Sequence, residues 1–349
     1  MYKIDRLPPL YLCNHWDRLG TEISGRFSGN TVFVFSQSGV WKKIKGPIQK
    51  SLRRSGFSIQ LHLLPEGEAA KSWLSVKGAW QFLFEHEADR HSLIVAVGGG
   101  TVGDAAGFIA STFKRGIPFV SVPTTLLAQV DSAIGGKVGI NDRGIKNSIG
   151  TFYFPEFIYI QPGVLRTLPE RALRSGLAEV IKAGILGDSR LFSLLEKATS
   201  RQKLFSTLQE ILSRAIRVKT NIVKKDPHEL KGIRYLLNFG HTMGHAIESE
   251  GKYRRWTHGE AVAAGMMMEA KIAHSEGFCS QQTLGRLQSL LKMQGLPVEV
   301  KGPIDWMPRI RQDKKRDGNE ISMVMLRKIG KAEVKKINLK KLNQCIQNY

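Results

Sequence analysis

The stretch Ser92–Asp104, SLIVAVGGGTVGD, decides the fold class of this chain. Its first half is a short apolar run, which is typical of a buried strand in a parallel sheet. Three consecutive glycines then lead into an Ala- and Gly-rich segment with helical character. A glycine cluster between a strand and a helix lets backbone N–H groups approach a phosphate at the helix N-terminus. The triplet differs from the usual G-x-G-x-x-G, but its strand and helix context favours a nucleotide-binding α/β domain.

Apolar runs on both sides of this stretch predict further strands of the same sheet, at residues 31–35, 58–64 and 118–122. The segment Ser36–Gly39 is expected to be the loop at the end of the first strand. After a turn at Pro65 and Gly67, a helix is expected to begin at Glu68 and Lys71 and to run through Glu87. Alternating strands and helices of this kind predict a Rossmann-like parallel sheet.

The last of these strands delivers a long glycine-rich segment at residues 123–150. Thr124 and Thr125 place hydroxyls at the carboxyl end of a strand, where open α/β sheets bind ligands. Four isolated polar or charged residues then sit among glycines: Asp131, Lys137, Lys146 and Asn147. A solvated loop is the alternative, but a loop of this composition is more often functional.

From about Pro162 onward, helical periodicity replaces the strand-like runs. Helices are expected at residues 169–186, 191–198, 204–225, 236–248, 259–275 and 282–293, with a closing strand pair at 321–328 and 331–337. The sequence therefore predicts α/β plus all-α architecture. An N-terminal Rossmann-like domain (1–165) would be followed by a mainly α-helical, metal-binding domain (166–349).

The helical half contains a candidate metal site in LLNFGHTMGHAIE, residues 236–248. His241 and His245 are spaced i, i+4, which places both imidazoles on one helix face. Paired histidines at this interval bind zinc in many enzymes, although two packed or surface histidines are the alternative. His258 and Glu179 are further candidate ligands, each in an Ala- and Gly-rich helical pattern. One carboxylate with two imidazoles is typical of a catalytic zinc site that keeps an open position.

Composition narrows the class of protein. A chain of 349 residues with 42% hydrophobic content suits a two-domain enzyme. The net charge of +22 would fit nucleic-acid binding, but the basic residues are spread over the chain and match no nucleic-acid motif. An enzyme for anionic small molecules explains the charge equally well. With no membrane-length apolar run, no signal-peptide pattern and three scattered cysteines (Cys13, Cys279, Cys345), the expected location is the cytoplasm.

A series of motifs between about Leu61 and Lys336 resembles the 3-dehydroquinate synthases of the sugar phosphate cyclase family. The motifs are PEGEAAKS, GGGTVGDAAGF, KRG, VPTTLLAQVDSAIGGKVGIN, GIKNSIG, TLPERALRSGLAEVIKAG, LLNFGHTMGHAIE, HGEAVAAGM and DKKRDG. The longest of them are highly specific. The resemblance implies a zinc site, with cobalt as the alternative metal, formed by Glu179, His241 and His258. On this interpretation His245 contacts substrate, so the first hypothesis of two metal-binding histidines in one helix is revised.

The resemblance also implies the residues that bind cofactor and substrate. NAD would contact Glu68, Lys71, Gly99, Gly100, Thr101, Asp104, Thr124, Thr125, Asp131, Ser132, Lys137 and Lys146. The catalytic and substrate-binding set would be Lys137, Lys146, Asn147, Lys182, Lys219, Arg234, Asn238, His245 and a lysine of the DKK loop, Lys314 rather than Lys315. Arg115 matches an arginine that reaches the neighbouring subunit's pocket, which implies a homodimer.

The implied substrate is 3-deoxy-arabino-heptulosonate 7-phosphate, whose carboxylate and phosphate suit a pocket of lysines and arginine. The implied reaction oxidises C5 with NAD, eliminates phosphate, reduces C5 again, opens the ring and closes the carbocycle by an aldol step. Zinc would act as a Lewis acid on the substrate hydroxyls, and the substrate's own phosphate would be the base. The product would be 3-dehydroquinate, an intermediate of aromatic amino acid biosynthesis, and no nucleic acid or membrane would take part.

Two positions depart from the family pattern. Where the family commonly has an Asp that contacts the adenosine end of NAD, this chain has Gln37, with Lys42 and Lys43 nearby. A one-residue insertion also lies between Lys219 and Arg234. Three rival functions remain: a sister cyclase for another sugar phosphate, a metal-dependent polyol dehydrogenase of the same fold, and a non-catalytic nucleic-acid-binding protein. The zinc residues argue against the last, and the lysines of the glycine-rich segment argue against the dehydrogenase.

Overall fold

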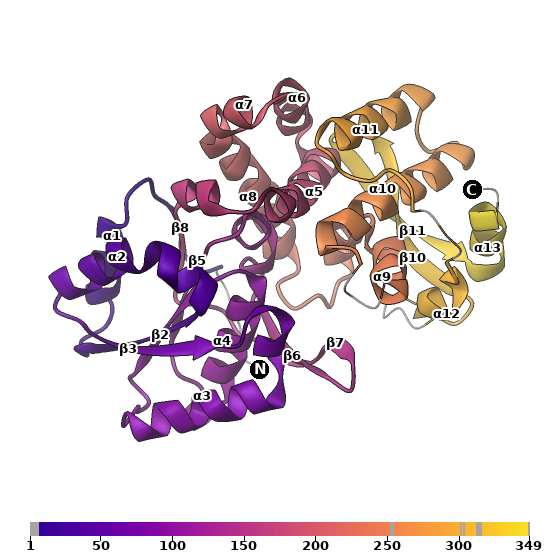
Figure 1. Cartoon of the computed structure of the whole chain (residues 1–349). Coiled ribbons are helices and arrows are strands. Elements are labelled where there is room, and N and C mark those ends of the chain that lie inside the picture. Colours follow the sequence, from indigo (N-terminus) through magenta and orange to yellow (C-terminus); the bar gives the residue numbers. More distant parts are fainter. Residues whose placement is uncertain (1–6, 252–254, 301, 303, 312–315, 348–349) are drawn as a thin grey trace. The chain divides into compact units, whose positions relative to one another are not determined.

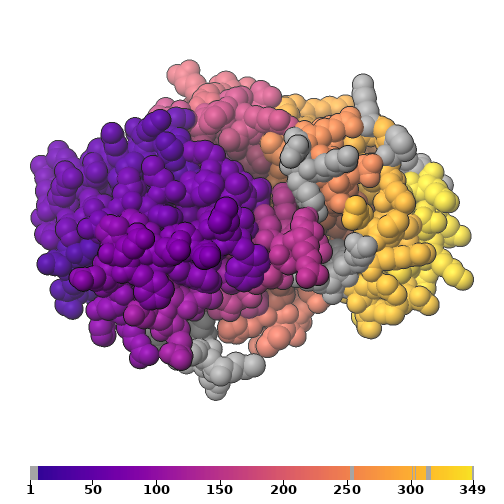
Figure 2. All heavy atoms as spheres, turned by 60° about the horizontal axis from the view of Figure 1, so that its bottom comes forward, coloured from indigo at the N-terminus to yellow at the C-terminus, as the bar shows by residue number. Residues whose placement is uncertain are grey.

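The computed structural model describes residues 7–251, 255–300, 302, 304–311 and 316–347. It divides into two compact units, Met1–Pro169 and Glu170–Tyr349, which can be followed by colour along the chain in Figures 1 and 2. Lys314 and its alternative Lys315 lie outside the described residues, so their predicted role stays a prediction.

The first unit contains a parallel sheet of six strands. In spatial order they are β1 (Leu10–Leu12), β8 (Ile158–Ile160), β5 (Phe119–Pro123), β4 (Leu93–Gly98), β2 (Thr31–Gln37) and β3 (Ser58–Leu64). The helices of this unit are α1 (Asp17–Ser24), α2 (Ser38–Arg54), α3 (Trp73–Glu85) and α4 (Gly100–Thr112), and the antiparallel pair β6 (Lys137–Asp142) and β7 (Ile145–Phe152) forms a separate hairpin. The predicted Rossmann-like architecture of this half is confirmed.

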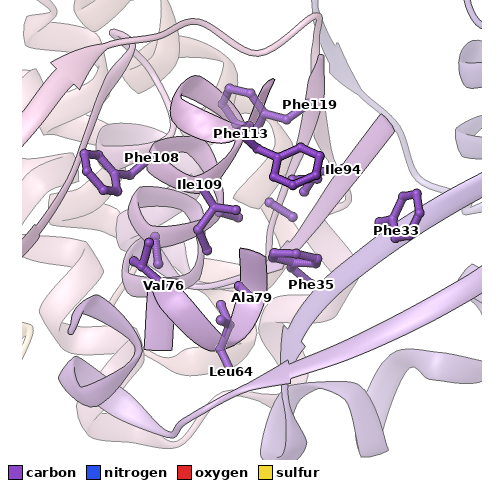
Figure 3. Close-up of a cluster of buried hydrophobic side chains, with 14 of the residues drawn as sticks. Phe33, Phe35, Leu64, Val76, Ala79, Ile94, Phe108, Ile109, Phe113 and Phe119 are labelled. Atoms are coloured by element: carbon purple, nitrogen blue, oxygen red, sulfur yellow. The ribbon is translucent and has the colours of Figure 1, made fainter. Parts of the chain in front are cut away.

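The core of this unit explains why its strands are apolar on both faces. Phe33 and Phe35 alternate with Val32 and Val34 along β2, and all four side chains are buried. The face that carries the two phenylalanines packs against α3 and α4, with Ile109 among the helix residues that fill the space (Figure 3). Burial of both faces is the rule for parallel sheets, because crossover helices cover each side.

The strand order reverses between β2 and β4. From β2 the chain runs outward through α2 to β3, then returns through α3 to β4 and continues in the opposite direction to β5. Gln37 is level with Leu64, and Ser36 is level with Val97, so the carboxyl ends of β2, β3 and β4 share one edge. Open α/β sheets bind ligands in the crevice at such a reversal.

The second unit is mainly helical. Its helices are α5 (Glu170–Gly187), α6 (Ser189–Lys197), α7 (Arg201–Ser206), α8 (Leu208–Lys225), α9 (His241–Glu250), α10 (His258–Ser275), α11 (Gln281–Met293), α12 (Trp306–Arg311) and α13 (Leu339–Gln347). An antiparallel sheet of β9 (Arg316–Asp317), β10 (Glu320–Lys328) and β11 (Lys331–Asn338) completes it. None of the described helices combines the length and the apolar character needed to cross a membrane.

Several segments differ from the sequence-based prediction. The loop expected at Ser36–Gly39 is instead the end of β2 and the start of α2. The helix expected at residues 236–248 is a 3-10 turn, Ile233–Asn238, followed by α9. The helix expected from Glu68 begins as a 3-10 turn at Gly67–Lys71, and α3 starts only after Ser72, whose hydroxyl accepts a hydrogen bond from Ser75 N at 3.2 Å. The helix expected at residues 204–225 is broken at Thr207. The glycine-rich segment is not a loop throughout, because it contains a π-helical turn and the hairpin of β6 and β7. Polar and glycine-rich strands give little apolar signal, which explains the last difference.

Candidate functional site

A cavity of the first unit lies at the carboxyl ends of β4 and β5, where α4 begins. Several residues predicted from the sequence line it together, namely Gly99, Gly100, Asp104, Ser132 and Lys137. Gly98 and Gly103 also face it. The predicted glycine cluster therefore does stand between a strand end and a helix N-terminus, where unpaired N–H groups can receive a phosphate.

The glycines of this cavity are crowded by side chains. A Cβ atom added to Gly100 would lie 2.9 Å from Ser132 Oγ, and one added to Gly99 would lie 3.1 Å from Thr125 Cγ2. Ser132 Oγ is buried and has no hydrogen-bond partner among the described residues. A buried hydroxyl without a partner beside a glycine-lined helix N-terminus fits a ligand that brings its own acceptors, such as a dinucleotide pyrophosphate.

A charged cluster lies beside the cavity. The ammonium group of Lys71, which is buried, donates to Asp104 Oδ2 at 2.6 Å and to the amide oxygen of Asn147. Burial raises the pKa of the Asp104 carboxyl, although the neighbouring ammonium works in the other direction. Asn147 has a positive φ of 53°, and Asn is among the residues that tolerate this backbone region best. Three predicted site residues thus lie together: Lys71 of the 3-10 turn, Asp104 of α4 and Asn147 of β7.

Other predicted residues of this unit are placed around the same edge. Thr124 is buried and its N–H donates to Gly98 O at 2.8 Å, while Thr125 Oγ1 accepts from Ala128 N at 3.2 Å. Glu68 accepts a hydrogen bond from Asn141 Nδ2 at 2.8 Å. The remaining members are Thr101 in the first turn of α4, Asp131 in the π-helical turn and Lys146 on β7.

The second unit brings Glu179, His241 and His258 together. One ligand atom from each residue lies within 4.8 Å of the other two. Glu179 Oε1 lies 3.4 Å from His258 Nε2 and 3.6 Å from His241 Nε2. Tetrahedral ligands at zinc bond lengths of about 2.0–2.1 Å would stand about 3.3 Å apart. Separations and donor types therefore fit a zinc-like metal with one open position.

Local sequence explains how the helices present these side chains. His258 is the first residue of α10, and the Thr257–Glu260 capping box fixes that start through bonds of 3.3 and 2.8 Å. His241 begins α9 after Gly240, whose φ of +79° suits glycine. Glu179 projects from the buried middle of α5.

Close backbone contacts at two glycines bring together the helices that carry the three side chains. A Cβ atom on Gly259 would lie 2.0 Å from Ser175 O of α5, and one on Gly265 would lie 2.1 Å from Gly240 O. These obstacles are backbone atoms, which cannot move aside as a flexible side chain can. The helices α5, α9 and α10 therefore approach closely enough for their side chains to share one metal.

The electrostatics of the group keep Glu179 ionised. Burial alone would raise the pKa of this carboxyl, but Lys182, one turn along α5, and His258 outweigh it and lower the pKa to about 2. For His258, burial lowers the pKa, whereas Glu179 and Glu248 raise it to about 10. An ionised carboxylate in a buried site is the form in which Glu binds a cation.

Each histidine of the group offers its Nε2 to the site and has an acceptor near its Nδ1. For His241 the acceptor is Phe239 O, at 3.2 Å, and for His258 it is Glu248 Oε2, at 3.4 Å. Glu248 is 5% exposed and was missed from the sequence. The signal that could have found it is its spacing of seven residues from His241, on the same face of α9.

The other predicted residues of this unit lie on α5, α8, α9 and the 3-10 turn Ile233–Asn238. Lys182, Lys219 and Arg234 are buried, and both α8 and this turn pack against α5. Arg234 Nη1 donates to Pro227 O at 2.8 Å. His245 is exposed, and its ring centre lies 5.5 Å from that of His241. Among the described residues, the group that could hold a metal consists of Glu179, His241 and His258.

A second carboxylate missed from the sequence shapes the loop before α9. Asp226 accepts backbone N–H bonds from Leu230 and Lys231 with Oδ1, at 2.8 and 3.1 Å, and from Ile233 with Oδ2, at 3.1 Å. These bonds lower the pKa of Asp226 in spite of its burial. The loop leads directly into the turn that carries Arg234 and Asn238, so Asp226 helps to fix both.

Sequence comparisons agree with this geometry. The profile described as 3-dehydroquinate synthase N-terminal matches residues 61–175, and the corresponding C-terminal profile matches residues 176–316. A 3-dehydroquinate synthase of Desulforamulus reducens is 40% identical over 336 residues, which cover 95% of this chain and 93% of the relative. One from Dictyoglomus thermophilum is 46% identical over 274 residues, or 78% of this chain and 77% of the relative.

Solved structures share the fold of the whole chain. The 2-epi-5-epi-valiolone synthase of Streptomyces hygroscopicus subsp. jinggangensis, with NAD⁺ and Zn²⁺ bound, superposes with a TM-score of 0.86 at 26% identity, covering 100% of this chain and 98% of that one. A 2-deoxy-scyllo-inosose synthase, complexed with carbaglucose-6-phosphate, NAD⁺ and Co²⁺, gives 0.85 at 25% identity, covering 97% and 96%. Structural neighbours therefore combine NAD⁺ with a divalent metal on this fold.

Proposed function

The chain belongs to the 3-dehydroquinate synthase family, and we infer that it converts 3-deoxy-arabino-heptulosonate 7-phosphate into 3-dehydroquinate and phosphate. This is a carbon–oxygen lyase reaction of the shikimate pathway, which leads to the aromatic amino acids. The observation that carries the inference is the convergence of Glu179, His241 and His258 from three helices in a chain with these relatives.

Glu179, His241 and His258 are proposed to hold zinc, with cobalt as the alternative. When bound there, the metal supplies Lewis acidity at the substrate hydroxyls. The chain's own contribution is orientation: Phe239 O and Glu248 fix the two imidazole rings, and Lys182 stabilises the ionised carboxylate. Such outer contacts commonly set both the tautomer of a ligating histidine and its basicity.

The cavity of the first unit is proposed to hold NAD, which supplies a hydride acceptor that is regenerated in each turnover. The free N–H groups at the start of α4 would receive the pyrophosphate. Lys71 and Asp104 form an ion pair that fixes both side chains at the edge of this cavity. The proposal also includes the cofactor contacts predicted for Glu68, Thr101, Thr124, Thr125 and Asp131.

The substrate carries a carboxylate and a phosphate, and we assign their binding to cationic and amide side chains. In the first unit these are Lys137, Lys146 and Asn147; in the second they are Lys182, Lys219, Arg234, Asn238 and His245. Buried cations such as Lys182 and Arg234 bind anions more strongly than exposed ones, because water screens them less. No protein base is required, since the substrate's own phosphate can accept the proton.

A homodimer in the cytoplasm is proposed, with Arg115 serving the neighbouring subunit's site. Arg115 is exposed on a turn after α4, and it has a positive φ of 69°, as does its neighbour Lys114 at 49°. Strained backbone of this kind often presents functional side chains. The described cysteines are all free thiols, which suits a reducing compartment.

An assay with three substrates tests the proposed function. Phosphate release is measured with the heptulosonate phosphate and with glucose 6-phosphate, which represents the substrates of another cyclase class. NADH formation is measured with glycerol. We expect phosphate release from the heptulosonate phosphate alone, together with loss of activity after chelation and recovery with zinc or cobalt. Preference for another sugar phosphate would assign a sister cyclase, and net NADH formation from glycerol would assign a polyol dehydrogenase.

A further inference from the structure

The helix α9 has no side-chain cap of its own at the residue where it begins. Its N-cap is Gly240, and the third residue of the helix, Met243, offers no carboxylate to the Gly240 N–H. That N–H is instead bound by Glu269 of α10, whose Oε2 accepts from Gly240 N at 2.8 Å. Glu269 is 1% exposed, and no step of the proposed reaction uses it. A buried carboxylate with no assigned role therefore fixes the start of a helix that carries a proposed metal ligand.

Glu269 does for α9 what a capping box does within a single helix. In α10 the side chain of Glu260 accepts from the N–H of the N-cap residue Thr257 at 2.8 Å. In α9 the corresponding acceptor comes from a neighbouring helix, where the positive end of the α9 dipole favours a carboxylate. Because this acceptor belongs to α10, the bond also fixes α9 relative to the helix that carries His258.

The side chain of Glu269 lies on the face of α10 that meets the start of α9. Val262, Met266 and Glu269 are spaced i, i+4 and i+7, which places them on one helix face. A Cβ atom added to Gly240 would lie 2.7 Å from Val262 O and 2.4 Å from Met266 Cγ. His258 is one helical turn before Val262 on the same face. One face of α10 thus carries a proposed metal ligand at its beginning and binds the start of α9 further along.

The peptide group that Glu269 binds also contacts the imidazole of His241. Gly240 N and Phe239 O belong to this one group, and Phe239 O lies 3.2 Å from His241 Nδ1. A neutral imidazole that binds a metal through Nε2 carries its proton on Nδ1 and donates it in a hydrogen bond to such a carbonyl. Because a peptide group is planar, a bond that fixes the direction of its N–H also fixes the direction of its C=O. The acceptor on the N–H also polarises the C=O and strengthens its bond to the ring.

We propose that Glu269 is a positioning residue for the metal, which acts on His241 through the peptide group that it binds. This inference rests on the proposed metal site. Its carboxylate fixes the peptide N–H, the peptide C=O orients the imidazole, and the imidazole presents Nε2 to the metal. Each histidine of the site then depends on a glutamate from the helix of the other. Glu248 of α9 contacts His258 directly. Glu269 of α10 reaches His241 through one peptide group.

Two conservative variants separate the reach of this side chain from its charge. Glu269→Asp keeps the charge, but the side chain is one methylene shorter and withdraws its oxygens from Gly240 N. Glu269→Gln keeps the length and an oxygen acceptor, but it removes the charge. Glu196→Gln is the matched control, because the Glu196 carboxylate of α6 also accepts hydrogen bonds from a neighbouring helix, from Arg286 of α11 at 3.0 and 2.8 Å. Neither α6 nor α11 carries a proposed metal ligand.

The experiment measures zinc affinity by competition with a chromophoric chelator, the absorption spectrum of the cobalt-loaded protein, and the melting temperature of the metal-free protein. We expect Glu269→Asp to weaken zinc binding about tenfold or more, as for the loss of other outer partners of a metal ligand, and to change the cobalt spectrum. Glu269→Gln should lose no more than about threefold, because its oxygen still binds the peptide N–H, although less strongly than a charged one. Glu196→Gln should match wild type in zinc affinity and cobalt spectrum.

Two patterns in the variants would overturn the inference. A loss of zinc affinity in Glu269→Gln as large as that in Glu269→Asp would show that the charge acts on the site, and not the bond to Gly240 N. Wild-type zinc affinity in Glu269→Asp, even with a lower melting temperature, would show that the role is structural only. In both cases the proposed function is unaffected.

Two further measurements on wild type complete the test. If Glu269→Asp does not fold, hydrogen exchange of the metal-free wild type decides. The Gly240 N–H should then exchange as slowly as the buried amides of α10, and fast exchange would overturn the inference. If wild type binds neither zinc nor cobalt, the proposed metal site itself fails, and this inference fails with it.

Discussion

The glycines of the cavity proposed for the nucleotide and those of the proposed metal centre are crowded by different kinds of atom. In the cavity, the space beside Gly98, Gly99 and Gly100 is filled by the side chains of Val102, Thr125 and Ser132. In the metal centre, Gly259 and Gly265 are met by the backbone of neighbouring helices. The first arrangement leaves backbone N–H groups accessible to a ligand, whereas the second sets the distance between helices that carry the ligands.

This difference predicts different consequences of mutation. A site made of backbone amides is weakened when a side chain covers them, with little effect on the fold. A site made of side chains on closely packed helices is lost when a ligand is removed, and it is distorted when the helices are forced apart. The metal centre should therefore be more sensitive to mutation than the cavity. Damage to one site should leave ligand binding at the other unchanged.

The largest effect is expected for His258→Ala. Loss of one ligand removes the Lewis acid, whose contribution of several kcal/mol corresponds to about a thousandfold in turnover. Metal analysis should show little bound zinc, and NAD titration should give wild-type affinity, because the cavity lies in the other unit. Near-stoichiometric zinc with normal turnover would disprove the ligand assignment.

Gly259→Ala should be the most damaging glycine substitution. The new methyl group would stand 2.0 Å from Ser175 O, and overpacking against backbone is expected to lower the free energy of unfolding by about 3 kcal/mol. Chemical denaturation measures the change. Gly285→Ala on α11 is the control, because no described atom lies within 4 Å of its added Cβ. That variant should gain about 0.5–1 kcal/mol through helix propensity; equal destabilisation of both variants would contradict the packing argument.

Glu248→Ala tests orientation of a ligand without removing it. The carboxylate lies 3.4 Å from His258 Nδ1, and loss of such a partner is expected to weaken metal binding about 10–100-fold. Competition with a chromophoric chelator measures the affinity, and the spectrum of the cobalt-loaded enzyme reports the geometry. Glu248→Gln, which keeps an acceptor, should recover part of the loss. Unchanged affinity in the Ala variant would show that Glu248 does not act on the metal.

Gly100→Ala should have the smallest effect of the four. Its methyl group would displace Ser132 Oγ, now 2.9 Å away, and narrow the approach to the N-terminus of α4. NAD affinity measured by titration should fall about tenfold, or about 1.4 kcal/mol, with zinc content and melting temperature unchanged. A large loss of stability would mean that this glycine resembles those of the metal centre, and the comparison would then fail.

Sequence patterns were most informative where one physical requirement dominates. The strand β4 was predicted to within one residue, because burial on both faces demands a continuous apolar run. The break at Thr207 was missed, since apolar periodicity continues across it. The hairpin of β6 and β7 was missed because its strands are rich in glycine and polar residues.

The same contrast applies to the two sites. Glu179, His241 and His258 could be identified from ligand chemistry and resemblance. Glu248 could not, because it looks like an ordinary surface glutamate until its neighbours in space are known. At Gln37, where the family commonly has an Asp that contacts NAD, the structure shows a contact that the sequence did not reveal: the side-chain amide donates to Pro65 O and Gly67 O of the loop after β3.

The central claim is that one chain uses a metal and a recycled dinucleotide to release phosphate, and a stoichiometric measurement tests it most directly. The zinc-loaded enzyme, with NAD below the substrate concentration, is followed at once for phosphate, 3-dehydroquinate and NADH. The account predicts equal amounts of phosphate and 3-dehydroquinate, many turnovers per NAD and no accumulation of NADH. Phosphate release without NAD, or one NADH accumulated per turnover, would contradict it.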